Sequence, residues 1–344
     1  MNTGIDKCLN KFCYKIGQDP LLVQGAGGNV SIKNDGILLV KASGTSLSQA
    51  LDKNIFVEVD LDYMNMKFGK GNFSFTPNAI GESNLRPSIE TMLHAIMKHK
   101  VVVHLHMISA LTHLVKIGSE DHLSKIIGDD FNWAYVSYTK PGENLAMAVS
   151  EILDKKPKTD VIFLENHGIV IGSDSIASAE ELLRKLDVKL GRDSICNKQI
   201  YSNIPKSINT QLKDFKLCNE NKLHNLVLNR DLFYILSNYW ALFPDHVVFL
   251  GNKPLIVNQL NQLDDLEESI LNSHCFIFIK NIGVLQHVNA TDAQKEQLSC
   301  YYDVISNIDP NQKLKTLSKN EIGELLNWDA EIYRQELSKN KQLQ

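Results

Sequence analysis

The residues most able to do chemistry in this chain are histidines spaced to share a metal ion. His104 and His106 lie in the apolar run 101–107, whose β-branched residues are typical of a buried strand. Side chains at positions i and i+2 of a strand point to the same face, so the two imidazoles should project together. Imidazole nitrogens suit zinc and its neighbours among the divalent ions. Two inert, hydrogen-bonded core histidines are the alternative.

A third histidine and a glutamate extend this pattern. His167 lies at a break between two short apolar runs, in the sequence Glu-Asn-His-Gly. Glu90 follows Pro87, a residue favoured at the start of a helix because its missing N–H costs nothing there. We therefore expect Glu90 in the first turns of a helix over residues 88–98. Three histidine ligands would leave one metal position open for substrate, with a carboxylate beside it as acid or base.

The composition describes a mildly acidic chain that can bury a sizeable core. It has 344 residues, of which 43% are hydrophobic, and a formal net charge of -4, which argues against a general nucleic-acid or membrane-surface binder. The first residues contain no apolar signal-like stretch, and no run of about 18 apolar residues occurs. We expect a cytoplasmic protein whose partner is a small molecule. Six cysteines without a Cys-x-x-Cys pair indicate reduced thiols.

The elements that would position these residues alternate between helices and strands, which indicates an α/β fold. Asp35-Gly36 between apolar runs predicts a β-hairpin, because glycine tolerates a positive φ. The early sheet should therefore be antiparallel and not a Rossmann βαβ start. The other expected elements are helices over 4–16, 108–117, 121–127, 143–154 and 176–195, and strands over 101–107, 133–138 and within 161–171.

A glycine-rich loop over residues 25–28 precedes the first strand. Its spacing matches neither the P-loop nor the dinucleotide fingerprint. Successive backbone N–H groups there could hold a phosphate or a carboxylate. The glycines could equally do no more than permit a tight turn. Ser43-Gly44-Thr45 forms a second short polar loop at a strand end.

In this order, the motifs resemble those of the class II aldolase/adducin family. The matching segments, within roughly residues 5–195, are Gly28-Asn29-Val30-Ser31, Ser43-Gly44, Pro87-Ser88-Ile89-Glu90, His104-Leu105-His106 and Asn166-His167-Gly168. The resemblance implies a three-layer α/β/α fold with a central, mainly antiparallel sheet. It implies a metal held by His104, His106 and His167, with Glu90 as the catalytic acid/base. It also implies a phosphate site formed by Gly28, Asn29, Ser43, Gly44 and Ser88.

Within the family, the chain is most similar to the aldolase part of bifunctional rhamnulose-1-phosphate aldolase/short-chain dehydrogenases. This similarity rests on Arg-Pro-Ser-Ile-Glu-Thr, Val-Val-Val-His-Leu-His, Lys-Pro-Gly-Glu-Asn-Leu-Ala and Pro-Asp-His-Val-Val. We expect no dehydrogenase part, because the residues after 204 are too few and lack its glycine fingerprint. Two departures leave the substrate open. Ile89 stands where many family aldolases have a serine, and Tyr138 does not match the motif of the proton-donating tyrosine.

Together these features predict a metal-dependent lyase of the class II aldolase type. With one divalent ion per chain, for which zinc is expected, it would cleave or form a C–C bond in a sugar or phosphorylated ketose through an enediolate. The same intermediate would serve an epimerase, a decarboxylase or a dehydratase. A non-catalytic, adducin-like scaffold is a further alternative, but a scaffold has no need of the complete set of polar site residues. The resemblance also implies a homo-oligomer, with a tetramer favoured.

The chain is expected to form two domains, a catalytic domain over 1–204 and a structural C-terminal α/β extension over 205–344. The sequence around Asn281-Ile282-Gly283 echoes Asn166-His167-Gly168 with its flanking apolar runs. Because Ile282 replaces His167, we interpret the extension as containing a degenerate partial repeat that cannot hold the ion. Chance similarity of two short units is the alternative. The polar segment 197–215 is the predicted linker.

Overall fold

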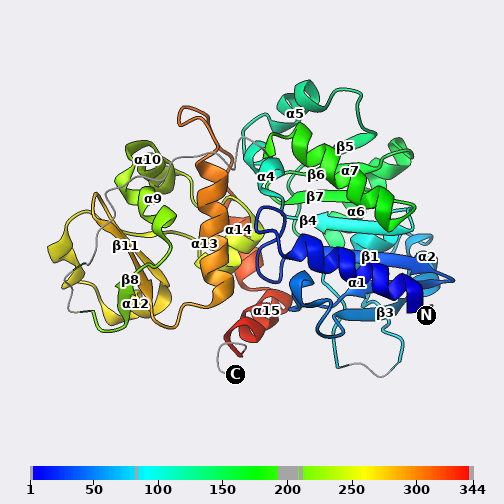
Figure 1. Cartoon of the computed structure of the whole chain (residues 1–344), viewed down its shortest axis with the longest axis horizontal. Coiled ribbons are helices and arrows are strands. Elements are labelled where there is room, and N and C mark those ends of the chain that lie inside the picture. The colour runs from blue at the N-terminus through cyan, green and yellow to red at the C-terminus, as the bar shows by residue number, and fades with distance from the viewer. Residues whose placement is uncertain (1–2, 82–83, 193–207, 209–211, 341–344) are drawn as a thin grey trace. The chain divides into compact units, whose positions relative to one another are not determined.

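The computed structural model describes residues 3–81, 84–192, 208 and 212–340 (Figure 1). The chain forms two compact units, the first made of Met1–Leu114 and Gly118–Arg192, the second of Val115–Ile117 and Asp193–Gln344. The predicted domain boundary after residue 204 and most of the predicted linker lie outside the described residues.

The first unit is built on a seven-stranded sheet with the strand order β3-β2-β1-β4-β7-β6-β5. Its strands are β1 (Asn29–Asn34), β2 (Ile37–Lys41), β3 (Phe56–Asp60), β4 (Val101–Leu105), β5 (Trp133–Val136), β6 (Val161–Leu164) and β7 (Gly168–Ser173). Neighbouring strands pair antiparallel except β5 and β6, which are parallel. The sheet is therefore mainly antiparallel, as predicted.

Helices cover both faces of this sheet. They are α1 (Thr3–Gly17), α2 (Leu61–Phe68), α3 (Thr91–Ile96), α4 (Ile108–Leu114), α5 (Ser119–Ile127), α6 (Glu143–Lys155) and α7 (Ile176–Lys189) (Figure 1). Apolar residues of α1, α4, α5 and α7 pack on one face, and those of α2, α3 and α6 pack on the other. The predicted three-layer α/β/α arrangement is confirmed.

The alternation of side chains along β4 decides which face carries the candidate chemistry. Val101, Val103 and Leu105 belong to the core beneath α1 and α7, whereas Val102 packs in the cluster formed with α3 and α6. His104 has the same parity as Val102 and therefore points to the α3/α6 side.

The hairpin predicted from Asp35-Gly36 is present. The φ angles of Asp35 and Gly36 are 47° and 74°, as a two-residue turn of the mirror-image type requires, and Asn34 pairs with Ile37 across it. The other predicted helices and strands of this unit are also present, with ends shifted by a few residues. The helix expected over 176–195 ends at Lys189, and residues 193–195 of that prediction lie outside the described ranges.

One predicted helix start is wrong. The helix expected over 88–98 begins at Thr91 and ends at Ile96. Pro87 forms an isolated antiparallel bridge with Ala42, so tertiary pairing holds it in an extended segment. Glu90 is consequently the N-cap residue, with φ -100° and ψ 12°, and lies in a turn before the helix.

The second unit contains a smaller sheet with the strand order β8-β11-β10-β9. Its strands are β8 (Phe215–Leu217), β9 (Leu255–Val257), β10 (Phe276–Ile279) and β11 (Gly283–His287). Its helices are α9 (Asn225–Leu228), α10 (Arg230–Asn238), α11 (Pro244–Leu250), α12 (Glu268–Ser273), α13 (Asp292–Ile305), α14 (Lys319–Leu326) and α15 (Asp329–Asn340).

The strand pairing of the second unit repeats that of the first. A parallel pair, β9 and β10, precedes an antiparallel hairpin, β10 and β11, just as β5 and β6 precede the β6–β7 hairpin. Ile279 lies opposite Gly283 across the second hairpin, and Leu164 lies opposite Gly168 across the first. In each unit a further strand, β8 or β4, pairs antiparallel with the last strand of the hairpin.

The two hairpin turns also agree in detail. Asn166 and Asn281 both have left-handed backbone, with φ 52° and φ 58°. The Asn166 N–H donates to the Leu114 carbonyl at 3.3 Å, and the Asn281 N–H donates to the Val227 carbonyl at 3.0 Å. The Leu114 carbonyl belongs to α4, which follows β4, and the Val227 carbonyl belongs to α9, which follows the equivalent strand β8. This shared pattern supports the predicted partial repeat over chance similarity.

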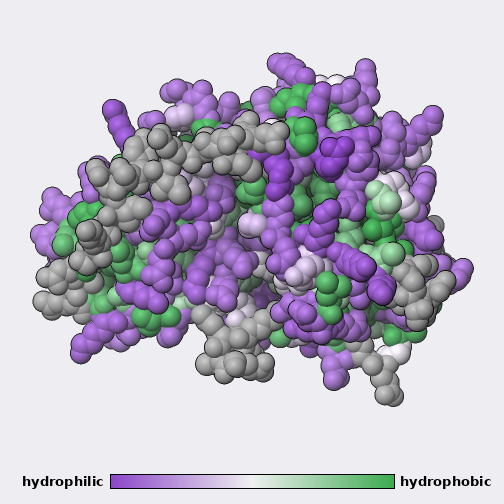
Figure 2. Space-filling model, viewed as in Figure 1, coloured by the Kyte–Doolittle hydropathy of each residue, from purple (hydrophilic) through white to green (hydrophobic). Residues whose placement is uncertain are grey.

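The described surface is mainly hydrophilic on the face drawn in Figure 2, where hydrophobic residues appear in small separate groups. No described helix combines the length and the apolar character that a membrane span requires. The cysteines within the described ranges are free thiols, and Cys196 lies outside those ranges.

Candidate metal centre

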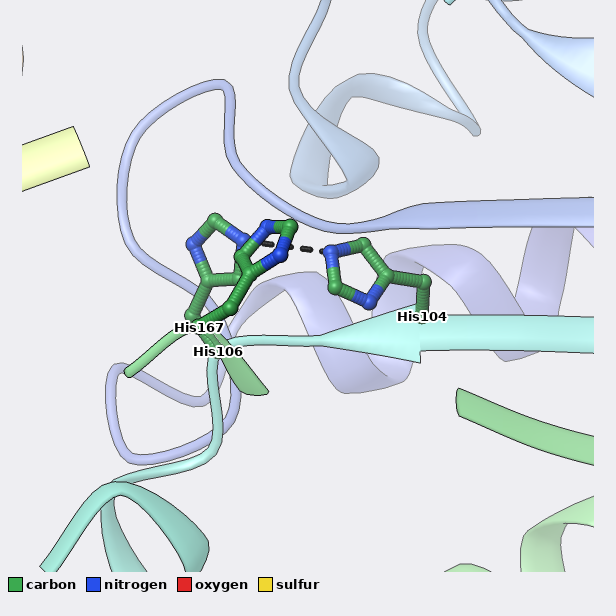
Figure 3. Close-up of side chains that lie close together, drawn as sticks. All are labelled: His104, His106 and His167. Atoms are coloured by element: carbon green, nitrogen blue, oxygen red, sulfur yellow. Dashed lines mark hydrogen bonds between the residues drawn. The ribbon is translucent and has the colours of Figure 1, made fainter. Parts of the chain in front are cut away.

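Three imidazoles meet at the end of β4, beside the turn between β6 and β7. Figure 3 shows His104, His106 and His167 pointing toward one another. Taking one nitrogen from each ring, the three atoms lie within 4.8 Å of one another, and the Nε2 atoms of His104 and His106 are 3.2 Å apart. All three residues are buried, with at most 6% of any of them exposed.

The sequence predicted that both histidines of the His-x-His pair lie in one strand, and this is wrong. β4 ends at Leu105, so His104 is its penultimate residue and His106 lies just beyond it. The predicted convergence still occurs, because the chain turns after Leu105 and brings the second ring to the first. His167 reaches the same place from the left-handed turn at Asn166.

The hydrogen bonding of His104 prepares one nitrogen for a cation. Its Nδ1 lies 2.9 Å from the Ile169 carbonyl oxygen, which can only accept, so Nδ1 carries the proton. The other nitrogen, Nε2, then carries no proton, and its lone pair, which could bind a metal ion, is directed at the other rings. A backbone acceptor on the outer nitrogen is the usual arrangement of a metal-binding histidine. The donor set therefore fits a divalent ion of the zinc type.

Glu90 faces the same three rings. Its Oε2 lies 3.3 Å from Nε2 of His104, and its Oε1 lies 3.3 Å from Nε2 of His167. The Asn29 side-chain amide donates to Oε2 at 2.7 Å, and both residues are 5% exposed. Asn29 is placed there because it opens β1 directly opposite His104. The carboxylate is thus held by a side chain that the sequence assigned only to phosphate binding.

The loops of the predicted phosphate site are tied together by Lys41, which sequence reasoning missed. The Lys41 ammonium donates to the carbonyls of Ala26, at 3.0 Å, and Thr45, at 2.7 Å, and the residue is only 1% exposed. It joins the glycine-rich loop to the Ser43-Gly44-Thr45 loop. The one signal in the sequence was a charged residue closing an apolar strand.

A third segment is joined to these two loops through the backbone. The Ser43 N–H donates to the Arg86 carbonyl at 2.8 Å, beside the bridge between Ala42 and Pro87. Ser88 is buried, and its hydroxyl accepts the Glu90 N–H at 3.2 Å. The structure thus connects the segments that carry Ser43, Gly44 and Ser88, while anion binding by them stays a prediction.

Gly28 lies where a side chain would be strained and tightly packed. Its φ is 65°, and a Cβ there would lie 3.1 Å from the His104 carbonyl oxygen. Glycine is therefore favoured by the left-handed backbone and also by the close approach of the loop to β4, which would have to shift by a few tenths of an ångström to admit a Cβ.

The next histidine on α3 is not part of this group. His94 is fully buried, and its Nδ1 lies 2.8 Å from the Ser31 hydroxyl. Burial lowers the pKa of His94 well below its ordinary value, so the ring is neutral at physiological pH.

The repeated hairpin of the second unit lacks the corresponding ligands. Aligning Gly283 with Gly168 places Ile282 at the position of His167. The same alignment pairs Leu217 with His104, because they lie opposite Leu285 and Val170 in register. Asn219, two residues after Leu217, then corresponds to His106. Within the described ranges, His104, His106 and His167 are the one group of this kind that could hold a metal ion.

Comparisons with known proteins give a family match and a distant curated relative. The family model described as Class II Aldolase and Adducin N-terminal domain matches residues 11–188. The uncharacterized oxidoreductase YuxG of Bacillus subtilis (strain 168) is 22% identical over 293 residues, which are 74% of this chain and 42% of that protein. The chain thus spans less than half the length of this curated relative.

Solved structures with partial similarity include the following two. The N-terminal class II aldolase domain of a conserved protein from Thermoplasma acidophilum is 24% identical, with a TM-score of 0.47, over 56% of this chain and 95% of that chain. An L-fuculose 1-phosphate aldolase is 16% identical, with a TM-score of 0.42, over 57% of this chain and 87% of that chain.

Proposed function

Since this chain belongs to the class II aldolase and adducin family, we propose that it is a metal-dependent carbon–carbon lyase acting on a sugar or phosphorylated ketose. The observation that carries the proposal is the buried group of three imidazoles within 4.8 Å, with the Glu90 carboxylate 3.3 Å from two of them. A scaffold protein with the same fold would not need this set of polar side chains inside its core.

In this proposal His104, His106 and His167 hold one divalent ion, zinc in the first instance. Three neutral imidazoles are a common ligand set for catalytic zinc and leave a position for substrate. When bound, the ion supplies Lewis-acid stabilisation of the negative charge that develops on the oxygens of a ketose.

Glu90 moves the proton in this scheme. In the cleavage direction its carboxylate takes a proton from the hydroxyl whose carbon becomes the aldehyde, and it returns a proton to the carbon of the other fragment. Asn29 keeps the carboxylate facing the reacting centre, because its amide donates to Oε2 at 2.7 Å. A positioned acid/base of this kind contributes roughly 10²- to 10⁴-fold in rate.

We assign the anionic end of the substrate to the loops joined by Lys41. The residues that bind this anionic group would be Gly28, Asn29, Ser43, Gly44 and Ser88. Asn29 would serve both groups, since one amide N–H donates to Glu90 and the amide has a second N–H.

The remaining parts of the proposal concern the whole chain. The second unit is non-catalytic, because Leu217, Asn219 and Ile282 stand at the positions equivalent to the three ligands. The chain acts as a homo-oligomer, with a tetramer favoured, and works in the cytoplasm. Within the family we group it with the aldolase parts of the bifunctional rhamnulose-1-phosphate aldolases.

The test is a substrate screen with defined metal content. The purified chain is loaded with zinc, and phosphorylated and unphosphorylated ketoses are followed by NMR for aldehyde release. We expect a phosphorylated ketose to be cleaved, and Glu90→Gln to slow cleavage by about 10²-fold or more, whereas the partly exposed Glu180→Gln leaves the rate unchanged. A single epimer, carbon dioxide or a dehydrated product would instead identify an epimerase, a decarboxylase or a dehydratase. A zinc-loaded chain without any of these activities would overturn the proposal.

A further inference from the structure

The second unit contains a cavity that the proposed reaction does not use. Its volume is about 760 Å³, which lies in the range of small-molecule sites. All its lining residues belong to the second unit. It lies where β10 begins and β11 ends, at the other end of that hairpin from Ile282. The cavity is therefore not a remnant of a metal position, and we call it the C-terminal cavity.

The lining of the C-terminal cavity has a one-sided charge. None of the described residues that line it is an aspartate or a glutamate, whereas Lys339 contributes an ammonium group. Lys339 lies near the end of α15 and forms no ion pair with any residue in the described ranges. An ammonium group without a carboxylate partner on a cavity wall favours an anionic ligand.

Both imidazoles keep one nitrogen for a ligand. Nδ1 of His287 accepts the Asn289 N–H at 3.1 Å, so its proton is on Nε2. Nδ1 of His274 lies 2.9 Å from the Ile270 carbonyl and donates to it. Neither Nε2 has a protein partner among the described residues. Asparagine amides and serine hydroxyls line the same space, as a ligand with several hydroxyl groups would require.

The wall that carries Lys339 is firmly attached to the rest of the unit. Arg334 of α15 forms a two-point ion pair with Asp245 of α11, at 2.9 and 3.1 Å, and also contacts Glu331 at 2.8 Å. These residues are at most 9% exposed. The Gln335 side chain adds a hydrogen bond to the Val248 carbonyl. A wall fixed in this way lowers the entropy cost of binding.

The cysteine in the lining does not change this picture. Burial raises the pKa of the Cys275 thiol to about 11, against the opposing effect of the Lys339 ammonium. The thiol is therefore neutral at physiological pH, so it adds no negative charge and is a poor nucleophile.

We propose that the C-terminal cavity binds a small hydroxylated anion, with its phosphate or carboxylate head group at Lys339 and its hydroxyl groups at the imidazoles and amides. The second unit would then have a binding role in addition to a structural one. The proposal does not depend on the proposed lyase activity, because no residue of the first unit takes part.

Isothermal titration calorimetry on the full chain tests this site. The probes are D-ribose 5-phosphate for a phosphate head group, D-gluconate for a carboxylate and D-ribose for a neutral sugar. We expect at least one of the two anions to bind and D-ribose not to. Lys339→Ala should weaken binding of that anion by about 10-fold or more, the usual effect of losing a charge-assisted hydrogen bond.

Two variants make the result specific. Lys295→Ala is the matched control, because Lys295 is a neighbouring lysine that pairs with Asp292 at 2.8 Å and does not line the cavity. His287→Phe keeps an aromatic ring against Phe215 and removes Nε2, and it should also weaken binding. The proposal is overturned if neither anion binds, if D-ribose binds as tightly as they do, or if Lys339→Ala and Lys295→Ala bind alike. Thermal unfolding of each variant verifies that it is folded.

Discussion

His246 should make the second unit less stable as the pH falls below about 6.5. This residue of α11 is fully buried, and its ring centroid lies 4.2 Å from that of Trp240 and 4.6 Å from that of Tyr301. Nδ1 accepts the Leu242 N–H at 3.4 Å, and Nε2 has no hydrogen-bond partner among the described residues. Burial therefore lowers the pKa of His246 to about 3.

The size of the effect follows from the two pKa values of this residue. The unfolded chain titrates near 6.5, so below that pH it binds a proton that the folded chain rejects. Because the pKa of His246 is lower in the folded chain than in the unfolded chain, this residue does not affect the free energy of unfolding above about pH 6.5. The free energy of unfolding then decreases as the pH falls from 6.5 toward 3. Between pH 7.5 and 5.5 the loss is about 1.4 kcal/mol from this group alone.

Urea unfolding at the two pH values measures this loss. In a Trp133→Phe background the fluorescence comes from Trp240 and Trp328, both in the second unit, and linear extrapolation gives the unfolding free energy. His246→Phe keeps an aromatic ring of similar size but cannot titrate. We expect the parent chain to lose about 1.4 kcal/mol more than His246→Phe between pH 7.5 and 5.5.

The control is the partly exposed His274, whose replacement by phenylalanine should leave the difference between the two pH values as in the parent. If His246→Phe showed the same pH dependence as the parent, the reasoning would be refuted. The surrounding aromatic rings would then stabilise the imidazolium by cation–π attraction as much as burial destabilises it.

Four further predictions concern the first unit and the assembly. The purified chain should contain about one divalent ion, lost in His106→Ala; elemental analysis showing full metal content in that variant would contradict the ligand assignment. Glu90→Gln should keep the ion but lose about 10²-fold or more in turnover; a metal-free variant would make Glu90 a ligand first, and a fully active one would remove it from the mechanism. Asn29→Ala should lower kcat by about 10- to 100-fold, the effect of losing one hydrogen bond to a charged group, with metal content unchanged; a change in KM alone would mean that Asn29 binds the anion and does not position Glu90. Light scattering should give an oligomer, with a tetramer favoured, and a 38.8 kDa species alone at working concentration would argue against it.

The parts of the fold that the sequence predicted depend on local physics. Asp35-Gly36 folds as a hairpin because both residues tolerate a positive φ. The run 101–107 contains a buried strand because apolar β-branched residues pack well on both faces of a sheet. The order of the motifs then identified the family, which a family model also supports. The three layers of the fold were predicted from that resemblance.

The parts that the sequence did not predict depend on contacts between distant segments. Pro87 is as compatible with an extended bridge as with a helix start, and its pairing with Ala42 decided between them. Asn29 lies 61 residues from Glu90 in the chain, so their hydrogen bond leaves no local pattern. The same holds for Lys41, whose two acceptors belong to two separate loops.

The repeated hairpin offers a natural template for protein engineering. Asn281 keeps the left-handed turn and Gly283 keeps its place opposite Ile279, although no imidazole stands between them. In the sequence Asn166-His167-Gly168, the asparagine and the glycine therefore serve the backbone of the turn, and the histidine is the residue that the second unit does not share. Grafting histidines at Leu217, Asn219 and Ile282 would test whether this backbone needs anything more than three side chains to bind a metal ion.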